Sequence, residues 1–333
     1  MKQLIQRLTD VTGPSGYEQA VRDVVRAEIE GLADEVRVDA LGNLIARQGA
    51  KADGGLRIML SAHMDEIGLI VTHIDDNGFA RFSNIGGVYP VHCVGARVVF
   101  LNGTRGLIYM DRPESPERMP ALDSLYVDVG ASDKASSPVK VGDLAVFERP
   151  FMDLGKRIVA KAMDDRVAVA VMIETMRALQ GKDSPHELVF VFSTQEEVGL
   201  RGATTAAYSV DPDLGLAVDV TRTGDLPKGV KMEVALGKGP AIKVRDSGML
   251  SDPRVVRWMA GVAEQAGIPY QMEVLEAGTT DARAIQLTRA GVPSGCLSIP
   301  TRYIHSPSEM VDMDDLDNSV RLLTALLTTA IKL

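Results

Sequence analysis

The chain has 333 residues, a length typical of about two domains and enough to bury a full core without disulfides. Its net charge of −9, without a cluster of lysine and arginine, argues against nucleic acid as a partner. No apolar run is long enough to span a bilayer, and the N-terminus lacks the apolar core of a signal peptide. Cys93 and Cys296 are the only cysteines, and we expect both to be reduced in a cytoplasmic protein.

The first part of the chain, residues 1–66, is predicted to contain two helices followed by three strands. Hydrophobic periodicity and turn residues place them, in order, at 1–10, 15–30, 35–39, 43–47 and 57–63. Ser15 and Glu18 fit a capping box that would open the second helix. The last strand is almost continuously apolar, which is typical of a strand buried on both faces.

Residues 67–150 have a different character, with short β-rich segments and no convincing helix pattern. Turns such as Asp76-Asn77-Gly78 separate these segments. The pattern predicts a small all-β barrel or sandwich inserted into the surrounding domain. Within it, residues 111–120 are rich in proline and charge and predict an exposed, mobile loop.

Helices and strands alternate again in the remaining segment, residues 151–333. We predict helices at 165–179, 201–208, 251–267, 281–291 and 314–331, and strands at 187–194, 214–219, 270–276 and 293–300. The predicted fold class is therefore α/β. A discontinuous domain of residues 1–66 and 151–333 is interrupted by a β domain of residues 67–150.

Chemically active side chains occur where predicted strands end in loops or just before a predicted helix. In open α/β sheets, ligands bind in the crevice beyond the carboxyl ends of the strands. Two imidazoles and several carboxylates at that edge suit a pair of divalent metals and a catalytic base. The candidates are His63, Asp164, Glu196, Glu197, Asp219 and His305.

Each candidate also has an ordinary structural explanation when it is taken alone. A histidine at a strand edge commonly pairs with an aspartate, and an aspartate before a helix commonly caps it. The ordered set is far more specific than any single member. The residues leave open whether Asp164 or Asp165 joins two metals. We assign Asp164 as the bridge and give Asp165 a structural or supporting role.

Glu196 and Glu197 divide between two roles in this interpretation. Adjacent residues point in different directions, so one can bind a metal while its neighbour faces the attacking water. A general base has to reach that water without being fixed on the metal. We therefore assign Glu197 as a ligand and Glu196 as the base. Asp65 follows His63 by two positions and is predicted to hold the second ring nitrogen of that histidine, as part of the catalytic group.

The charges of the assigned groups balance for a paired-metal site. Three carboxylates (Asp164, Glu197 and Asp219) and a bridging hydroxide neutralise two divalent ions, as a desolvated site requires. Mixed histidine and carboxylate ligands favour Zn²⁺, with Co²⁺ or Mn²⁺ as alternatives. Two such ions suit hydrolysis.

Seven motifs together resemble the tetrahedral (TET-type) metallo-aminopeptidases. This family includes glutamyl, leucyl, lysyl and deblocking aminopeptidases, and proteins labelled cellulase M or endoglucanase. The similarity covers nearly the whole chain. The motifs are, in order, AHMDEIG, MDDR, STQEEVGLRGA, LAVDVT, LGKGPAI, GTTDARAIQ and PTRYIHSPSEMV.

The resemblance implies a zinc-peptidase-like, three-layer α/β/α catalytic domain that carries an inserted β-barrel dimerisation domain. It implies that His63, Asp164 and Asp219 hold one metal, that Asp164, Glu197 and His305 hold the other, and that Glu196 is the base. It also implies homo-oligomers, with dimers that assemble into a tetrahedral dodecamer. Residues 276–281 depart from the glycine-rich stretch of many relatives, so substrate preference is not carried over.

The predicted function is a metal-dependent aminopeptidase that removes N-terminal residues from short peptides. A dinuclear deacylase on the same fold is the nearest alternative. A glycosidase is the second, although glycosidases use two carboxylates that flank the bond rather than a metal pair. A metal-dependent scaffold without catalysis is the third.

Overall fold

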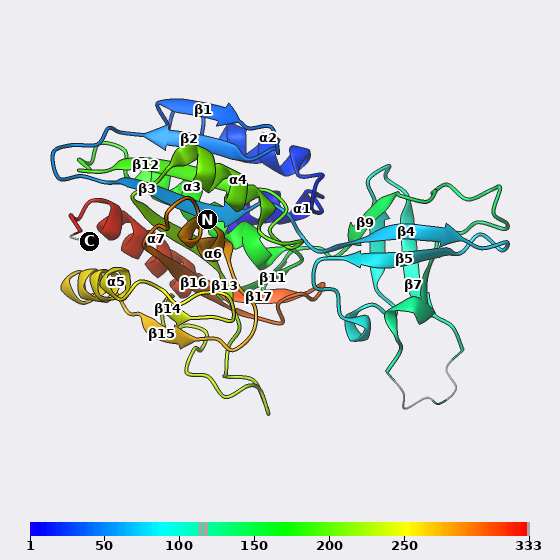
Figure 1. The fold of residues 1–333 in the computed structure, drawn as a ribbon. Coiled ribbons are helices and arrows are strands. Elements are labelled where there is room, and N and C mark those ends of the chain that lie inside the picture. The colour runs from blue at the N-terminus through cyan, green and yellow to red at the C-terminus, as the bar shows by residue number, and fades with distance from the viewer. Residues whose placement is uncertain (113–114, 116–118, 332–333) are drawn as a thin grey trace.

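A mixed sheet of eleven strands forms the centre of the larger part of the protein, and a small barrel stands beside it in the computed structural model (Figure 1). The structure describes residues 1–112, 115 and 119–331. The sheet contains β1 (Glu35–Val38), β2 (Leu44–Gln48), β3 (Arg57–His63), β10 (Met152–Asp153), β11 (Arg157–Ala160), β12 (Glu187–Ser193), β13 (Leu214–Thr221), β14 (Ala241–Arg245), β15 (Gln271–Val274), β16 (Ser294–Arg302) and β17 (Glu309–Asp312). Its main order is β1-β2-β12-β3-β13-β16-β17-β11-β10, and β14 pairs with both β15 and β16.

Helices cover both faces of this sheet, which gives the predicted three-layer α/β/α arrangement. They are α1 (Lys2–Asp10), α2 (Gln19–Glu28), α3 (Met163–Ala178), α4 (Arg201–Val210), α5 (Pro253–Gln265), α6 (Asp281–Gln286) and α7 (Met313–Leu327). Apolar residues of α1, α2, α3, α5 and α7 share one core, while α4 and α6 contribute to a core on the opposite face. Neighbouring residues of β3 serve different layers, because Leu60 belongs to the first core and Met59 to the second. This confirms that β3 is buried on both faces.

The inserted segment forms a closed barrel with a core of its own. Its strands are β4 (Gly68–Ile74), β5 (Ala80–Ile85), β6 (Arg97–Phe100), β7 (Arg105–Met110), β8 (Leu125–Asp128) and β9 (Leu144–Phe147). They close in the order β4-β5-β8-β7-β6-β9 around residues such as Phe82, Ile108 and Phe147. Two short 3₁₀ turns, at Pro90–His92 and Leu122–Ser124, accompany the strands. Residues 113–114 and 116–118 lie outside the described residues, so the mobile loop at 111–120 stays a prediction.

Two predicted helix features are wrong. The capping box at Ser15 and Glu18 does not form, because the Ser15 hydroxyl donates to Asp65 at 2.6 Å and α2 begins at Gln19 without a side-chain cap. The helix predicted over 281–291 ends at Gln286, where the chain turns back and the Val292 N–H donates to the Gln286 carbonyl at 3.1 Å. In addition, the sequence pattern did not indicate the strands β10, β11, β14 and β17.

Two further observations bear on the environment of the protein. None of the helices in the described ranges combines the length and apolarity that a bilayer-spanning segment requires. Cys93 and Cys296 are both free and buried, one in the barrel core and the other in β16.

Candidate metal centre

The six predicted metal and base residues lie together at the carboxyl edge of the parallel strands. β3, β12, β13 and β16 run in the same direction, so their ends meet on one side of the sheet. His63 is the last residue of β3 and Asp219 lies near the end of β13, whereas His305 follows β16. All six border one cavity of about 810 Å³. This is the place where open α/β sheets bind ligands.

Asp164 lies between the two histidines and directs one carboxylate oxygen toward each of them. Its Oδ1 is 3.0 Å from His63 Nε2, and its Oδ2 is 3.3 Å from His305 Nε2. Glu197 Oε2 also approaches His305 Nε2, at 3.3 Å. A carboxylate that faces two imidazoles through separate oxygens has the arrangement of a ligand shared by two ions.

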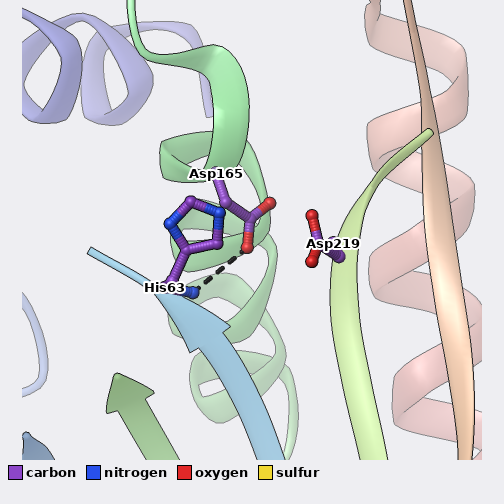
Figure 2. A group of neighbouring side chains, drawn as sticks. All are labelled: His63, Asp165 and Asp219. Atoms are coloured by element: carbon purple, nitrogen blue, oxygen red, sulfur yellow. Dashed lines mark hydrogen bonds between the residues drawn. The ribbon is translucent and has the colours of Figure 1, made fainter. Parts of the chain in front are cut away.

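Asp165 is closer to the cluster than a purely structural role requires. Its Oδ2 accepts the backbone N–H of His63 at 3.2 Å (Figure 2). Ligand atoms of His63, Asp165 and Asp219 lie within 4.8 Å of one another, as do those of His63, Asp164 and Glu197. Of these two aspartates, however, only Asp164 also contacts His305 among the described ion pairs, so the shared position fits Asp164 better than Asp165.

Asp65 connects the β3 end of the site to the β12 end. Its carboxylate accepts the backbone N–H of Glu196 at 2.9 Å and that of Glu197 at 3.2 Å. The second ring nitrogen of His63 lies 3.0 Å from the Asp65 carbonyl and 3.4 Å from its carboxylate. The backbone carbonyl is thus the nearer partner of His63, and the carboxylate mainly fixes the glutamate pair.

The electrostatics of the cluster show an excess of buried negative charge. Burial raises the pKa of Asp219, and the neighbouring carboxylate of Asp164 raises it further. Burial would also raise the pKa of Asp164, but hydrogen bonds with His305 and His63 outweigh it and hold this pKa below its usual range. Burial acts to lower the pKa of His305, yet Asp164 and Glu197 raise it to about 12. Desolvated carboxylates of this kind need cations beside them.

Several buried polar atoms at the site have no hydrogen-bond partner among the described residues, and this is the test of whether divalent ions fit. The atoms without a hydrogen-bond partner include Glu197 Oε1, Asp165 Oδ1 and His305 Nδ1. Buried polar atoms are rarely left unsatisfied unless a ligand, ion or water is bound there. Imidazole and carboxylate donors around one cavity are the set that Zn²⁺, Co²⁺ and Mn²⁺ accept. The residues present therefore fit divalent metal ions.

Glu196 differs from its neighbours because no hydrogen bond or close ion pair holds its carboxylate among the described residues. Its nearest cationic group is His63 Nε2, 3.8 Å from Oε2. Burial raises the pKa of Glu196 well above its usual range, despite the opposing effect of His63. The backbone is fixed by Asp65 while the carboxylate borders the cavity, so this side chain is placed to exchange protons with a molecule bound there.

Two buried carboxylates near the cluster did not follow from the sequence pattern. Glu309 accepts the backbone N–H groups of Asp164 and His305. Asp281 accepts the hydroxyls of Ser61 at 2.7 Å and Ser193 at 2.5 Å, both on strands that carry site residues. A glutamate four positions after a loop histidine is commonplace, and only the fold brings Asp281 to the β3 and β12 strands.

Comparisons of the sequence and the fold with known proteins identify the family of this chain. A model of the M42 glutamyl aminopeptidase family matches residues 42–322. The lysyl aminopeptidase of Pyrococcus furiosus is 36% identical over 98% of this chain and 96% of its own. The structure of aminopeptidase APDkam598 from Desulfurococcus kamchatkensis has a TM-score of 0.93 and 41% identity, and covers 99% of this chain and 95% of that one. The Pyrococcus horikoshii TET1 peptidase, which can assemble into a tetrahedron or a large octahedral shell, has a TM-score of 0.87 and 34% identity over 99% of each chain.

The fold and these matches define a hydrolase that acts as an exopeptidase. The chain belongs to the M42 glutamyl aminopeptidase family, whose members depend on metal, and it is an aminopeptidase. The predicted resemblance to TET-type aminopeptidases and the predicted fold class are both confirmed.

Proposed function

We propose that this aminopeptidase holds two divalent metal ions and removes N-terminal residues from short peptides. His63, Asp164 and Asp219 would bind one ion, and Asp164, Glu197 and His305 the other. The observation that carries this proposal is the position of Asp164, with Oδ1 at 3.0 Å from one histidine and Oδ2 at 3.3 Å from the other. Zn²⁺ is the ion that the donors favour most, with Co²⁺ or Mn²⁺ as substitutes.

The protein residues supply proton transfer and alignment in the proposed reaction. Divalent ions in the site would supply Lewis-acid polarisation of the scissile carbonyl and acidify water. Glu196 takes a proton from the attacking water at its free carboxylate and passes it to the leaving amine. Asp65 keeps Glu196 and Glu197 in place through their backbone N–H groups, so the base and the ligand act from fixed positions.

The lining of the cavity supports a preference for acidic or apolar side chains over basic ones. Apart from the four carboxylates of the centre, the described lining contains no acidic residue, whereas Arg222, Lys243 and Arg283 are cationic. Arg222 donates to the Tyr89 hydroxyl and Lys243 is paired with Glu273. No carboxylate partner of Arg283 occurs among the described residues, so this guanidinium is free to bind a substrate carboxylate.

The barrel supports a proposal about domains and assembly. We place the catalytic domain at residues 1–66 and 151–333 and a dimerisation domain at residues 67–150. The described barrel strands, which run from Gly68 to Phe147, fall within that insert. We propose that the barrel joins subunits into dimers and that dimers form a tetrahedral dodecamer, as the P. horikoshii relative can form a tetrahedron. Light scattering would test the assembly, since a mass of one or two subunits contradicts the dodecamer.

We also propose a cytoplasmic location, which the buried free thiols of Cys93 and Cys296 support.

The experiment that tests the proposed function compares metal-free and metal-reconstituted protein on aminoacyl-p-nitroanilides. The panel includes glutamyl, leucyl and lysyl substrates, with an N-acetylated substrate and a β-glucan as controls. We expect activity on free N-termini only, restored by Zn²⁺, Co²⁺ or Mn²⁺. Full activity in the metal-free protein would contradict the metal-dependent mechanism.

The same panel separates the two enzyme alternatives. A dinuclear deacylase on this fold would hydrolyse the N-acetylated substrate as well as, or better than, the free one. A glycosidase would release sugar from the glucan and would be insensitive to chelation, because its chemistry uses two carboxylates without metal. The histidines beside Asp164 favour the aminopeptidase over the glycosidase.

A further inference from the structure

Glu309 is a buried carboxylate that ties together two distant parts of the metal centre. It is the first residue of β17 and is 2% exposed. Its Oε2 accepts the backbone N–H of Asp164 at 3.0 Å, and its Oε1 accepts that of His305 at 2.7 Å. One side chain therefore uses both oxygens to set the spacing between two proposed ligands of the same ion.

The sheet topology explains why Glu309 reaches both segments. β17 pairs with β11 on one side, with Glu309 opposite Ala160, and β11 leads into the start of α3, where Asp164 has non-helical backbone angles. On the other side β17 pairs with β16, and His305 lies in the connection between these two strands. His305 has a positive φ of 63°, a conformation that few residues other than glycine adopt, so its backbone needs such a partner.

The ring of His305 is bounded on its other side by the barrel. Gly86 and Gly87 follow β5 and border the active-site cavity. A Cβ atom added at Gly87 would lie 2.2 Å from His305 Nδ1, which is closer than real Cβ contacts. The backbone of His305 is thus held by Glu309, and its ring packs so closely on Gly87 that a side chain at position 87 would displace it.

We propose that Glu309 is a positioning residue for the ion bound by Asp164, Glu197 and His305. Gly87 packs against the ring of His305 and limits where this ring can lie. This proposal rests on the proposed two-metal function. Residues that orient metal ligands in this way typically contribute about 10- to 100-fold to metal affinity. Glu309 is not among the described residues that line the cavity, and it contacts the backbones of two residues that are, so its effect acts through these ligands.

Titration of metal-free protein with Co²⁺ tests the proposal, because the visible absorption of bound Co²⁺ follows the filling of the two sites in turn as ions are added. In E309Q the amide oxygen can accept only one of the two backbone N–H groups, and the amide NH₂ faces the other. G87A moves the His305 ring without changing any charge. E187Q is the matched control: Glu187 is buried and accepts from Arg57 at 3.0 Å, but it lies at the start of β12, away from the site end.

We expect wild type and E187Q to bind two Co²⁺ ions per subunit with the same spectra. E309Q and G87A should each weaken the ion bound by Glu197 and His305 by about 10- to 100-fold. The ion beside His63 and Asp219 should weaken less, because it shares only Asp164 with the disturbed side of the site. Unchanged affinity for both ions in folded E309Q, or equal weakening of both, would overturn the proposal alone. Failure of the wild-type protein to bind two ions would overturn the proposed function and this proposal with it.

Discussion

Replacing Glu196 by glutamine should abolish most of the catalytic rate without disturbing the fold or the metal site. The two side chains have nearly the same shape, and no hydrogen bond or close ion pair holds the Glu196 carboxylate among the described residues. The free energy of unfolding should therefore change little. The amide cannot accept the proton of the attacking water. General base catalysis of this kind contributes about 10²- to 10⁴-fold, which corresponds to about 3–5 kcal/mol in the activation free energy.

The assay measures kcat on the preferred aminoacyl-p-nitroanilide and the metal content of the same sample. E197Q provides the comparison, because Glu197 approaches His305 at 3.3 Å and its loss should release one ion. We expect E196Q to retain both ions and wild-type stability while kcat falls by at least about 100-fold. An E196Q protein with both ions and kcat within a factor of about ten of the wild type would refute Glu196 as the base.

Three further predictions follow from individual contacts. K243M should lower the free energy of unfolding by about 3–5 kcal/mol, because it leaves the buried Glu273 carboxylate without its cation. The Lys243 ammonium and this carboxylate are 2.6 Å apart, and both are fully buried. A loss of less than about 1 kcal/mol in urea denaturation would contradict this prediction. Burial would raise the pKa of Asp225, but hydrogen bonds from Arg302 outweigh it and hold the pKa at about 2, below the ordinary 3.8. Because Asp225 is largely exposed, solvent screening reduces the stability that D225N removes to about 1 kcal/mol. This contribution should be complete above about pH 5 and vanish as the pH falls toward about 2, and a difference between the two proteins that stays constant over this range would contradict the prediction. R283A should lower kcat/KM for a glutamyl substrate by about tenfold and leave a leucyl substrate within about twofold; equal losses on both would show that Arg283 does not select the side chain.

Much of the architecture was predictable because its signals are local. The apolar run 57–63 indicated a strand buried on both faces, and β3 has alternate residues in two different cores. The short alternating segments of 67–150 indicated an all-β unit, which is the closed barrel. Ser15 misled the capping prediction because its hydroxyl is used by Asp65, a residue 50 positions away, and no local pattern reveals such a partner.

The site was predictable as a set of residue types at strand ends, but its internal arrangement was not. Which oxygen of Asp164 faces which histidine depends on how β3 and β16 converge on α3. The contacts of Glu309 with two ligand backbones depend on the pairing of β17 with β11, two strands that the sequence pattern did not indicate. Gly87 reaches His305 from the barrel, so its importance appears only once the two parts of the chain are placed together.

The most direct measurement of the central claim is anomalous diffraction from crystals grown with Co²⁺ and recorded at the cobalt absorption edge. We predict two peaks per subunit, both next to Asp164. One should lie beside His63 and Asp219 and the other beside Glu197 and His305. A single peak, a pair of peaks that share Asp165 instead, or peaks away from these residues would contradict the account.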